Sequence, residues 1–301
     1  MQLSTYIKGF KLYLQLEKNL SKNTIEAYLR DVNKIEKFCT DRNTDIDILK
    51  LPEWFFAEFI KWITESGGAA TSHARILSGI RAFYDYLVLE KHIDSNPTDL
   101  LEFPRLARKL PSVLSESEIE RLIQQVDASK EGGFRNKVIL ELLFACGLRV
   151  TELVNLEHAH VYFKEEFILV TGKGNKQRLV PISDSALKLI KLYLETERIK
   201  IEVKQKDKEI LFLSRRGARL SREFVFTIVK ELALKAGIRK KVSPHTFRHS
   251  FATSLITNGA DLRAIQNMLG HESITTTEIY AHLDRKHLQN VVDKFHPRSK
   301  K

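Results

Sequence analysis

The sequence contains little cysteine and no long apolar run. Its two cysteines, Cys39 and Cys146, lie within apolar helical patterns. Two are too few for a disulfide framework, and the spacing does not suggest a cysteine-based zinc site. No segment approaches the roughly 20 apolar residues of a membrane-spanning helix. Residues 1–19 are amphipathic and, unlike a signal peptide, are followed by acidic residues. We therefore expect a soluble, cytoplasmic protein with reduced cysteines.

Two enzyme motifs are present only in part. Gly172-Lys173-Gly174 lacks the Lys-Ser/Thr ending and the following helix of a phosphate-binding P-loop, which argues against nucleotide binding. His245 and His249 have the spacing of a zinc-protease helix, but that motif needs a glutamate between its histidines, and here Arg248 precedes His249. A guanidinium at this place would repel a divalent cation. We expect neither a metal nor a cofactor.

Positive charge is in excess, and the excess lies in one part of the chain. The 301 residues carry a net charge of +11. Residues 1–108 hold 15 Lys and Arg against 15 Asp and Glu, whereas residues 109–301 hold 34 against 23. This asymmetry is expected of a domain that follows nucleic-acid phosphates, although a basic surface that only confers solubility would give the same charge. The length and a hydrophobic content of 43% are sufficient for two domains.

Residues 1–90 carry the apolar spacing of helices throughout. Their aromatic residues follow the same spacing, so we interpret them as core residues rather than as platforms for stacked bases. The spacing predicts a small bundle of four amphipathic helices, over residues 1–17, 21–38, about 52–66 and 71–88. Residues 91–114 contain three prolines and no sustained periodicity, which predicts a linker.

The rest of the chain mixes helices with a β-hairpin. Two β-rich runs, Phe167–Thr171 and Gln177–Ile182, flank a Gly-Lys-Gly-Asn turn that holds Lys173. Ser115 and Glu118 form a capping box at a helix start. Further helices are expected over 136–146, 151–156, 184–199 and 223–236, a solvated loop over 198–208 and a short strand over 210–214. The predicted fold class is mainly α, with a four-helix bundle followed by an α+β domain that holds a small antiparallel sheet.

Residues 243–280 place four reactive side chains on or beside three short predicted helices. The first helix carries His245 and Arg248 on one face. His271 follows the glycine that ends the second helix, and the third helix carries Tyr280. A last apolar segment, residues 287–295, predicts a short helix that either folds back on its own core or docks on a partner.

Arginine, lysine, histidine and tyrosine together fit phosphoryl transfer to a tyrosine. Paired guanidiniums stabilise the charge that grows on the phosphate oxygens. A phenol with a pKa of about 10 needs a proton acceptor and a cationic pocket to become a nucleophile, and a lysine can protonate the leaving 5′ oxygen. One basic domain offers this whole set: Arg149, Lys173, His245, Arg248, His271 and Tyr280. The alternative is a DNA-binding module without chemistry, because each of these residues taken singly is more often structural.

Basic and polar residues near helix starts are candidates for contacts with DNA phosphates. A solvated surface role would explain each of them at least as well. The candidates are Lys22, Asn23, Thr24, Arg75, Arg81, Arg215, Arg216, Arg219, Arg222, Lys240 and Lys241.

The motifs CGLRVTEL, TGKGNKQR, PHTFRHSFAT, LGH and TTTEIY occur in this order along the chain. Together they closely resemble the tyrosine recombinases of the phage integrase family, and in particular the Xer type. The resemblance covers essentially all 301 residues, and its specific part is H-x-x-R followed by LGH and a tyrosine. The six active residues of the family fall on the six positions named above, without substitution. The closing FHPR looks more like the XerD branch than the XerC branch.

The resemblance implies a core-binding, SAM-like domain over residues 1–90, a linker over 91–114 and a catalytic domain over 115–301. Tyr280 would attack the scissile phosphate, leaving a 3′-phosphotyrosine and a free 5′-hydroxyl that Lys173 protonates. The other implied roles are phosphate binding by Arg149 and Arg248, hydrogen bonding and proton handling by His245 and His271, and orientation of neighbouring side chains by Glu152. Because the phosphotyrosine conserves bond energy, neither ATP nor a metal is implied.

The implied partner is double-stranded DNA with a dif-like recombination site, at which chromosome dimers are resolved during cell division. The resemblance further implies a synapse of four protomers, formed with itself or with a paired XerC-like recombinase, in which the last helix docks on a neighbour. A septal DNA translocase is a candidate regulator. The alternatives are a mobile-element integrase, a topoisomerase relative and a non-catalytic DNA-binding relative, and the sequence does not name the target site.

Overall fold

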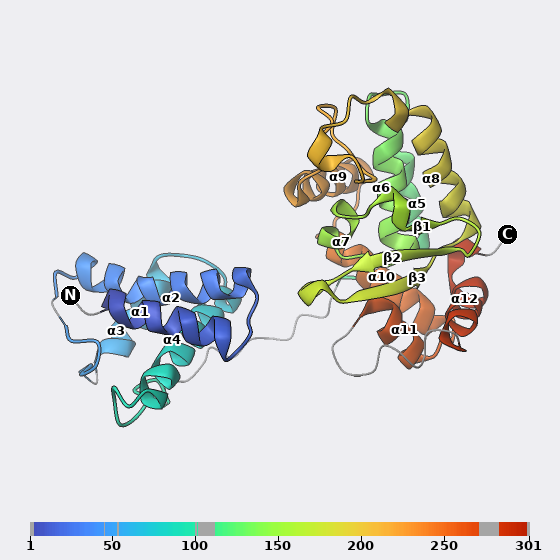
Figure 1. The fold of residues 1–301 in the computed structure, drawn as a ribbon. Helices are drawn as coiled ribbons and strands as arrows, with labels where there is room; N and C mark the ends of the chain where they lie inside the picture. Colours follow the sequence, from blue (N-terminus) through green and yellow to red (C-terminus); the bar gives the residue numbers. More distant parts are fainter. Residues whose placement is uncertain are drawn as a thin grey trace. The chain divides into compact units, whose positions relative to one another are not determined.

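The computed structural model describes residues 3–44, 46–52, 54–99, 101, 112–270 and 283–299, with residues 173, 283–287 and 299 described by their backbone alone. The chain divides into two compact units, Met1–Lys109 and Leu110–Lys301 (Figure 1). Among the described residues, the first unit has one buried apolar cluster and the second has two of its own, which confirms the expected two-domain architecture. Within the described ranges, no helix combines the length and the apolar character that a bilayer crossing requires.

The described part of the first unit holds the four predicted helices. They are α1 (Leu3–Leu16), α2 (Lys22–Asp41), α3 (Phe55–Glu65) and α4 (Ala70–Leu89). Helix α2 starts where the Ser21 hydroxyl accepts a hydrogen bond from the backbone N–H of Thr24. The Phe38 ring lies edge-on to Phe55 and Phe59, with ring centroids 5.3 and 5.5 Å apart. The aromatic residues therefore build the core, as their spacing predicts.

Helix α6 (Gly133–Ala145) lies at the centre of the second unit. It packs against α5, α7, α8 and α10, and its residues 138–140 and 142–145 are all buried, as expected of a helix that is covered on every side. The bounds of the other helices are α5 (Glu116–Gln124), α7 (Val150–Val154), α8 (Asp184–Thr196), α9 (Arg222–Lys235), α10 (Pro244–Thr257), α11 (Leu262–Leu269) and α12 (Leu283–Phe295).

A three-stranded antiparallel sheet lies beside these helices, in the order β1 (Val161–Tyr162), β2 (Phe167–Thr171) and β3 (Gln177–Pro181). The β2–β3 pair confirms the predicted hairpin, with Val170 opposite Arg178. Helices α11 and α12 both pack against β3, near which they are drawn in Figure 1. The sheet therefore connects the hairpin turn to the C-terminal part of the unit.

One expectation for the segment between α8 and α9 is wrong. Residues 210–214 form no strand; their pairing is limited to isolated bridges, Glu157 with Ile210 and Leu213 with Arg219. Residues 198–208 are mostly exposed, as expected of a solvated charged loop, and they are also anchored: Arg198 donates from Nη2 to the Lys208 carbonyl at 2.7 Å and from Nε to the Ile210 carbonyl at 3.2 Å. The half-buried Arg198 and two short 3-10 turns hold the charged run against the domain.

The C-terminal helix folds back on its own unit in the single chain. Leu288, Val291 and Val292 of α12 are buried with apolar residues of α10 and α11. Beyond α12, the His296 ring lies 4.8 Å from the Phe144 ring, measured between centroids. This is one of the two outcomes that the sequence left open for the tail.

Candidate active site

Helix α10 carries His245 and Arg248 as predicted. The Ser243 hydroxyl accepts a hydrogen bond from the backbone N–H of Thr246, and Pro244 occupies the first turn. This start sets the phase of the helix, so that residues three apart share a side. His245 stays exposed, whereas Arg248 is 8% exposed.

Arg248 connects α10 to the turn after α6 and to the end of α11. Its Nη1 donates to the Gly147 carbonyl at 2.8 Å, and its Nη2 donates to the Leu269 carbonyl at 2.5 Å. Burial, and then the positive charge of Arg149, lower the pKa of Arg248 to about 10. The guanidinium is therefore still charged at neutral pH.

Arg149 stands at the start of α7 and is held by Glu152. The backbone N–H of Arg149 donates to Glu152 Oε2 at 2.8 Å, and Arg149 Nη1 donates to Glu152 Oε1 at 2.9 Å. Arg149 Nη2 donates to the Gly270 carbonyl at 3.3 Å. Because 35% of the Arg149 side chain is exposed, a ligand can reach it while Glu152 fixes its direction.

A third arginine, Arg178 on β3, lies with Arg149 and Arg248, and these three residues with Glu152 are called the arginine cluster below. Arg178 was not among the residues predicted from the sequence. Its Nη1 and Nη2 donate to the two carboxylate oxygens of Glu152, both at 2.8 Å, and its Nε donates to the Met268 carbonyl at 2.7 Å. The sequence signal was the strand alternation, which puts Arg178 on the same face as the apolar Val180; a charge that is buried on such a face needs a partner.

Three guanidiniums lie around a single carboxylate at this place: Arg149 and Arg178 donate hydrogen bonds to Glu152, and Arg248 interacts with it through its charge. Burial alone would raise the pKa of Glu152, but the hydrogen bonds and charges of Arg178 and Arg149 outweigh it and lower the pKa. Glu152 is therefore ionised, and it compensates one of the three positive charges of Arg149, Arg178 and Arg248. The remaining positive charge favours binding of an anion such as a phosphate.

His245 borders the same cluster. Partial burial, and then the charges of Arg248, His249 and Arg149, lower the pKa of His245. The imidazole is accordingly neutral at neutral pH, and a neutral imidazole can accept a proton.

The turn of the β2–β3 hairpin holds Lys173, as predicted. Residues Lys173–Asn175 form one 3-10 turn, in which Gly174 and Asn175 have φ values of 71° and 60°. The backbone N–H of Gly172 donates to the Lys176 carbonyl at 2.8 Å. The remaining two predicted residues of the active site, His271 and Tyr280, lie outside the described residues.

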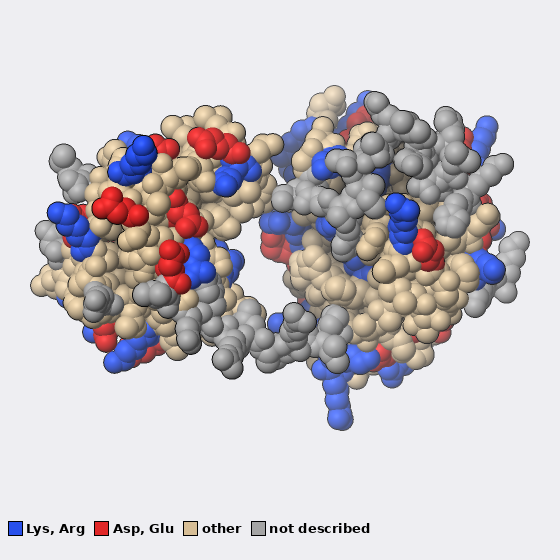
Figure 2. Space-filling model, turned by 90° about the horizontal axis from the view of Figure 1, so that it is seen from below, with Lys and Arg blue, Asp and Glu red and all other residues tan. Residues whose placement is uncertain are grey.

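In the first unit, two of the candidate DNA contacts have protein partners. Arg75 donates to both carboxylate oxygens of the buried Asp31, at 2.5 and 2.7 Å, and 49% of its side chain stays exposed. Arg81 Nη2 donates to the Thr98 carbonyl at 2.8 Å. Acidic and basic side chains are interspersed on the face of this unit in Figure 2. The other candidates here lie in the first turn of α2: Lys22, Asn23 and Thr24.

In the second unit, Lys240 and Arg219 are the candidates with the closest partners. Lys240 Nζ lies 2.7 Å from Glu118 Oε2, and Arg219 Nη1 donates to Asn155 Oδ1 at 2.5 Å. The other candidates are exposed: Arg215, Arg216, Arg222 and Lys241. For all eleven residues, contact with DNA stays a prediction.

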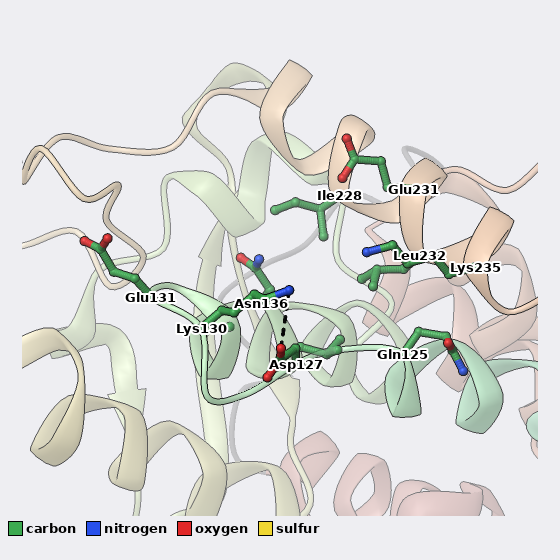
Figure 3. Close-up of a pocket in the computed structure, with 11 residues that line it drawn as sticks. Gln125, Asp127, Lys130, Glu131, Asn136, Ile228, Glu231, Leu232 and Lys235 are labelled. Carbon is green, nitrogen blue, oxygen red and sulfur yellow. Dashed lines mark ion pairs between the residues drawn. The ribbon is translucent and has the colours of Figure 1, made fainter.

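A pocket in the second unit shares no residue with the arginine cluster (Figure 3). It lies between the segment after α5 and helix α9, and Lys130 pairs with Asp127 at its edge, 3.4 Å apart. Its lining holds three acidic residues and two lysines, so it lacks the excess positive charge that would favour a phosphate. Among the residues with described positions, no three or more His, Cys, Asp or Glu side chains are grouped to hold a metal ion.

Comparisons with known proteins agree on one family. Residues 112–287 match the phage integrase family, and residues 7–91 match the phage integrase N-terminal SAM-like domain. The chain is 40% identical over 298 residues to the tyrosine recombinase XerD of Staphylococcus aureus, covering 99% of this chain and 100% of that protein.

Two solved structures are similar over nearly the whole chain. The XerA recombinase is 30% identical with a TM-score of 0.50, covering 98% of this chain and 99% of that one. The XerH recombinase, in a post-cleavage complex with its palindromic difH substrate, is 24% identical with a TM-score of 0.69, covering 97% and 95%. At 24% identity, the similarity to XerH shows a shared fold alone.

Proposed function

The chain belongs to the phage integrase family as a Xer-type tyrosine recombinase, an enzyme that transfers DNA strands, and we propose that the arginine cluster is its active site. The observation that carries the proposal is the excess positive charge around Glu152, whose single carboxylate binds Arg149 and Arg178 and faces the charge of Arg248. A phosphodiester placed there would supply the missing negative charge. Its charge rises further in the transition state, where guanidiniums bind most strongly.

Arg149 and Arg248 hold the non-bridging oxygens of the scissile phosphate. The phenol oxygen of Tyr280 forms a bond to phosphorus while the bond from phosphorus to the 5′ oxygen breaks, and Lys173 gives a proton to that oxygen. His245 and His271 hydrogen-bond the phosphate and take up the phenol proton. In the second step a 5′-hydroxyl of another strand attacks the 3′-phosphotyrosine and releases Tyr280. One phosphoester replaces another in each step, so the cycle needs no ATP.

The two domains divide the binding of DNA between them. Residues 1–90 act as the core-binding domain, residues 91–114 as the linker and residues 115–301 as the catalytic domain, and the two domains close on double-stranded DNA as a clamp. The positive excess in residues 109–301 supports this assignment. Phosphate contacts are assigned to the eleven exposed or half-exposed candidates named above.

The substrate is a dif-like site, and the outcome is resolution of chromosome dimers in the cytoplasm during cell division. Support comes from the 40% identity to a XerD recombinase over the whole chain. Four protomers form the synapse, either with copies of this chain or with a paired XerC-like recombinase. A septal DNA translocase regulates the exchange.

Recombination of a supercoiled plasmid with two directly repeated dif-like sites tests this function. Exchange resolves the plasmid into two smaller circles, and Arg149→Gln, which keeps the DNA-binding surface, yields none. Relaxation without resolution would instead identify a topoisomerase. DNA recovered as a covalent adduct from cells would map to one chromosomal site for a resolution enzyme, and to the ends of a mobile element for an integrase.

A further inference from the structure

The carbonyl groups at the C-terminal end of α11 accept hydrogen bonds from the arginine cluster. Carbonyl groups at a helix C-terminus have no partner within the helix, so they need donors from elsewhere. Here each of three consecutive carbonyls accepts a hydrogen bond from a different arginine: Met268 from Arg178, Leu269 from Arg248 and Gly270 from Arg149. The chain continues from this point directly into His271.

Arg178 and Glu152 also lie against the base of the hairpin turn. A Cβ atom at Gly172 would lie 3.6 Å from Arg178 Nη1 and 3.6 Å from Glu152 Oε1. Lys173 is the next residue in the chain. The ion pair of Arg178 and Glu152 therefore contacts three parts of the site: Arg149, the start of the turn that carries Lys173, and the end of α11 that leads into His271.

Arg178 faces the protein and not a ligand. Its Nε, Nη1 and Nη2 all donate to protein oxygens, and 13% of the side chain is exposed, against 35% for Arg149. Gly270 packs directly on it, since a Cβ atom there would lie 3.0 Å from Arg178 Cδ, and Gly270 has a φ of 63° that favours glycine.

We propose that Arg178 is a positioning residue of the recombination reaction: it fixes Glu152, and through it Arg149, while it holds the end of α11 against the hairpin that carries Lys173. The inference rests on the proposed function, because its main readout is DNA cleavage. Arginine suits this role because its rigid fork binds a carboxylate with two hydrogen bonds and leaves Nε for a third acceptor.

The role has a pH signature. The charged groups that face Glu152 are Arg149 beside it, Arg178 on β3 and Arg248 on α10, and the buried Cys146 thiol lies near Arg178. Without Arg178, the effect of burial on Glu152 is opposed mainly by Arg149. The carboxyl then takes up a proton at a higher pH than in the wild type, and a protonated Glu152 no longer holds Arg149 in place.

Three variants separate this role from a general loss of packing. Arg178→Gln removes the charge and the fork, and Arg178→Lys restores the charge alone. Arg198→Gln is the matched control, because Arg198 also donates to backbone carbonyls from Nε and Nη2 but lies on a segment that does not contact Glu152. Each variant is assayed for its rate of covalent adduct formation on a nicked duplex with a dif-like site, at saturating DNA, between pH 5 and 9.

Arg178→Gln is expected to lower the cleavage rate by roughly 10- to 100-fold, with a much smaller change in DNA affinity. The acid limb of its pH profile moves toward neutral pH, and Arg178→Lys moves the limb back while it restores only part of the rate. Arg198→Gln keeps the wild-type profile. The inference would be overturned if the cleavage rate of Arg178→Gln fell only in proportion to its loss of folded protein and its pH profile matched that of the wild type.

Thermal unfolding distinguishes this inference from the proposed function, because it needs no cleavage. Glu152 has a lowered pKa in the folded wild type, so its stabilising contribution is present at neutral pH and is lost on acidification. The difference in unfolding free energy between the wild type and Arg178→Gln should therefore narrow as the pH falls. The same difference between the wild type and Arg198→Gln should stay constant. A wild type that forms no adduct would refute the proposed function, and a gap for Arg178→Gln that is independent of pH would refute the positioning of Glu152.

Discussion

Protonation of His296 should destabilise the catalytic unit. The ring is fully buried, its Nδ1 accepts a hydrogen bond from the backbone N–H of Arg298 at 3.2 Å, and its Nε2 lies 3.3 Å from the Phe144 carbonyl. These partners suit the neutral ring with its proton on Nε2, because the charged ring has no acceptor nitrogen. Burial is the main cause that lowers the pKa of His296 to about 4.

The size and sign of the effect follow from the two pKa values. The unfolded chain takes up the proton near pH 6.5 and the folded chain only near pH 4, so stability is complete above pH 6.5 and is lost as the pH falls toward 4. A difference of about 2.5 units corresponds to about 3 kcal/mol. For a unit of this size, that loss lowers Tm by roughly 6–12 °C.

Thermal unfolding between pH 7.5 and 4 measures this loss. His296→Gln, which cannot titrate, should begin less stable at pH 7.5 and lose about 3 kcal/mol less on acidification than the wild type. His249→Gln is the matched control for an exposed histidine of the same unit, and its curve should stay close to that of the wild type. Parallel curves for the wild type and His296→Gln would refute the assignment of a buried neutral imidazole.

Three further predictions concern the site. Glu152→Gln leaves two guanidiniums without their carboxylate and should lower the unfolding free energy by about 3 kcal/mol. This value is at the low end for a buried pair because Arg149 is partly exposed. Denaturant titration measures the loss, and a loss below about 1 kcal/mol would contradict the buried pair. Gly147→Ala should lower both stability and cleavage rate, since φ is 58° and the new Cβ would lie 2.5 Å from Phe251 Cδ1; a wild-type Tm would exclude this strain. Cleavage of nicked DNA should persist in EDTA because the guanidiniums stabilise the phosphate charge, and its abolition, reversed by Mg²⁺, would require a metal.

Features that depend on neighbouring residues could be predicted from the sequence. The capping serines set the starts of α2, α5 and α10, and the Gly-Lys-Gly-Asn turn placed Lys173 between two strands. Helical spacing put His245 and Arg248 on one face. These positions follow from local backbone preferences, which act over a few residues.

Contacts between distant segments could not be predicted in the same way. Arg248 binds the carbonyl of Gly147, 101 residues away, and Arg178 binds that of Met268, 90 residues away. No periodicity reports such pairs, because they depend on how finished elements pack. The two-residue strand β1 was missed for a related reason, since its pairing with β2 exists only once the hairpin has formed.

The central claim is that Tyr280 is the nucleophile of a strand-transfer reaction, and the direct measurement is covalent capture of nicked DNA. The wild type should form a protein–DNA adduct that survives denaturation, with the 3′-phosphate attached to the protein. Tyr280→Phe should bind the same duplex with unchanged affinity and form no adduct. An adduct that persists in Tyr280→Phe would contradict the account.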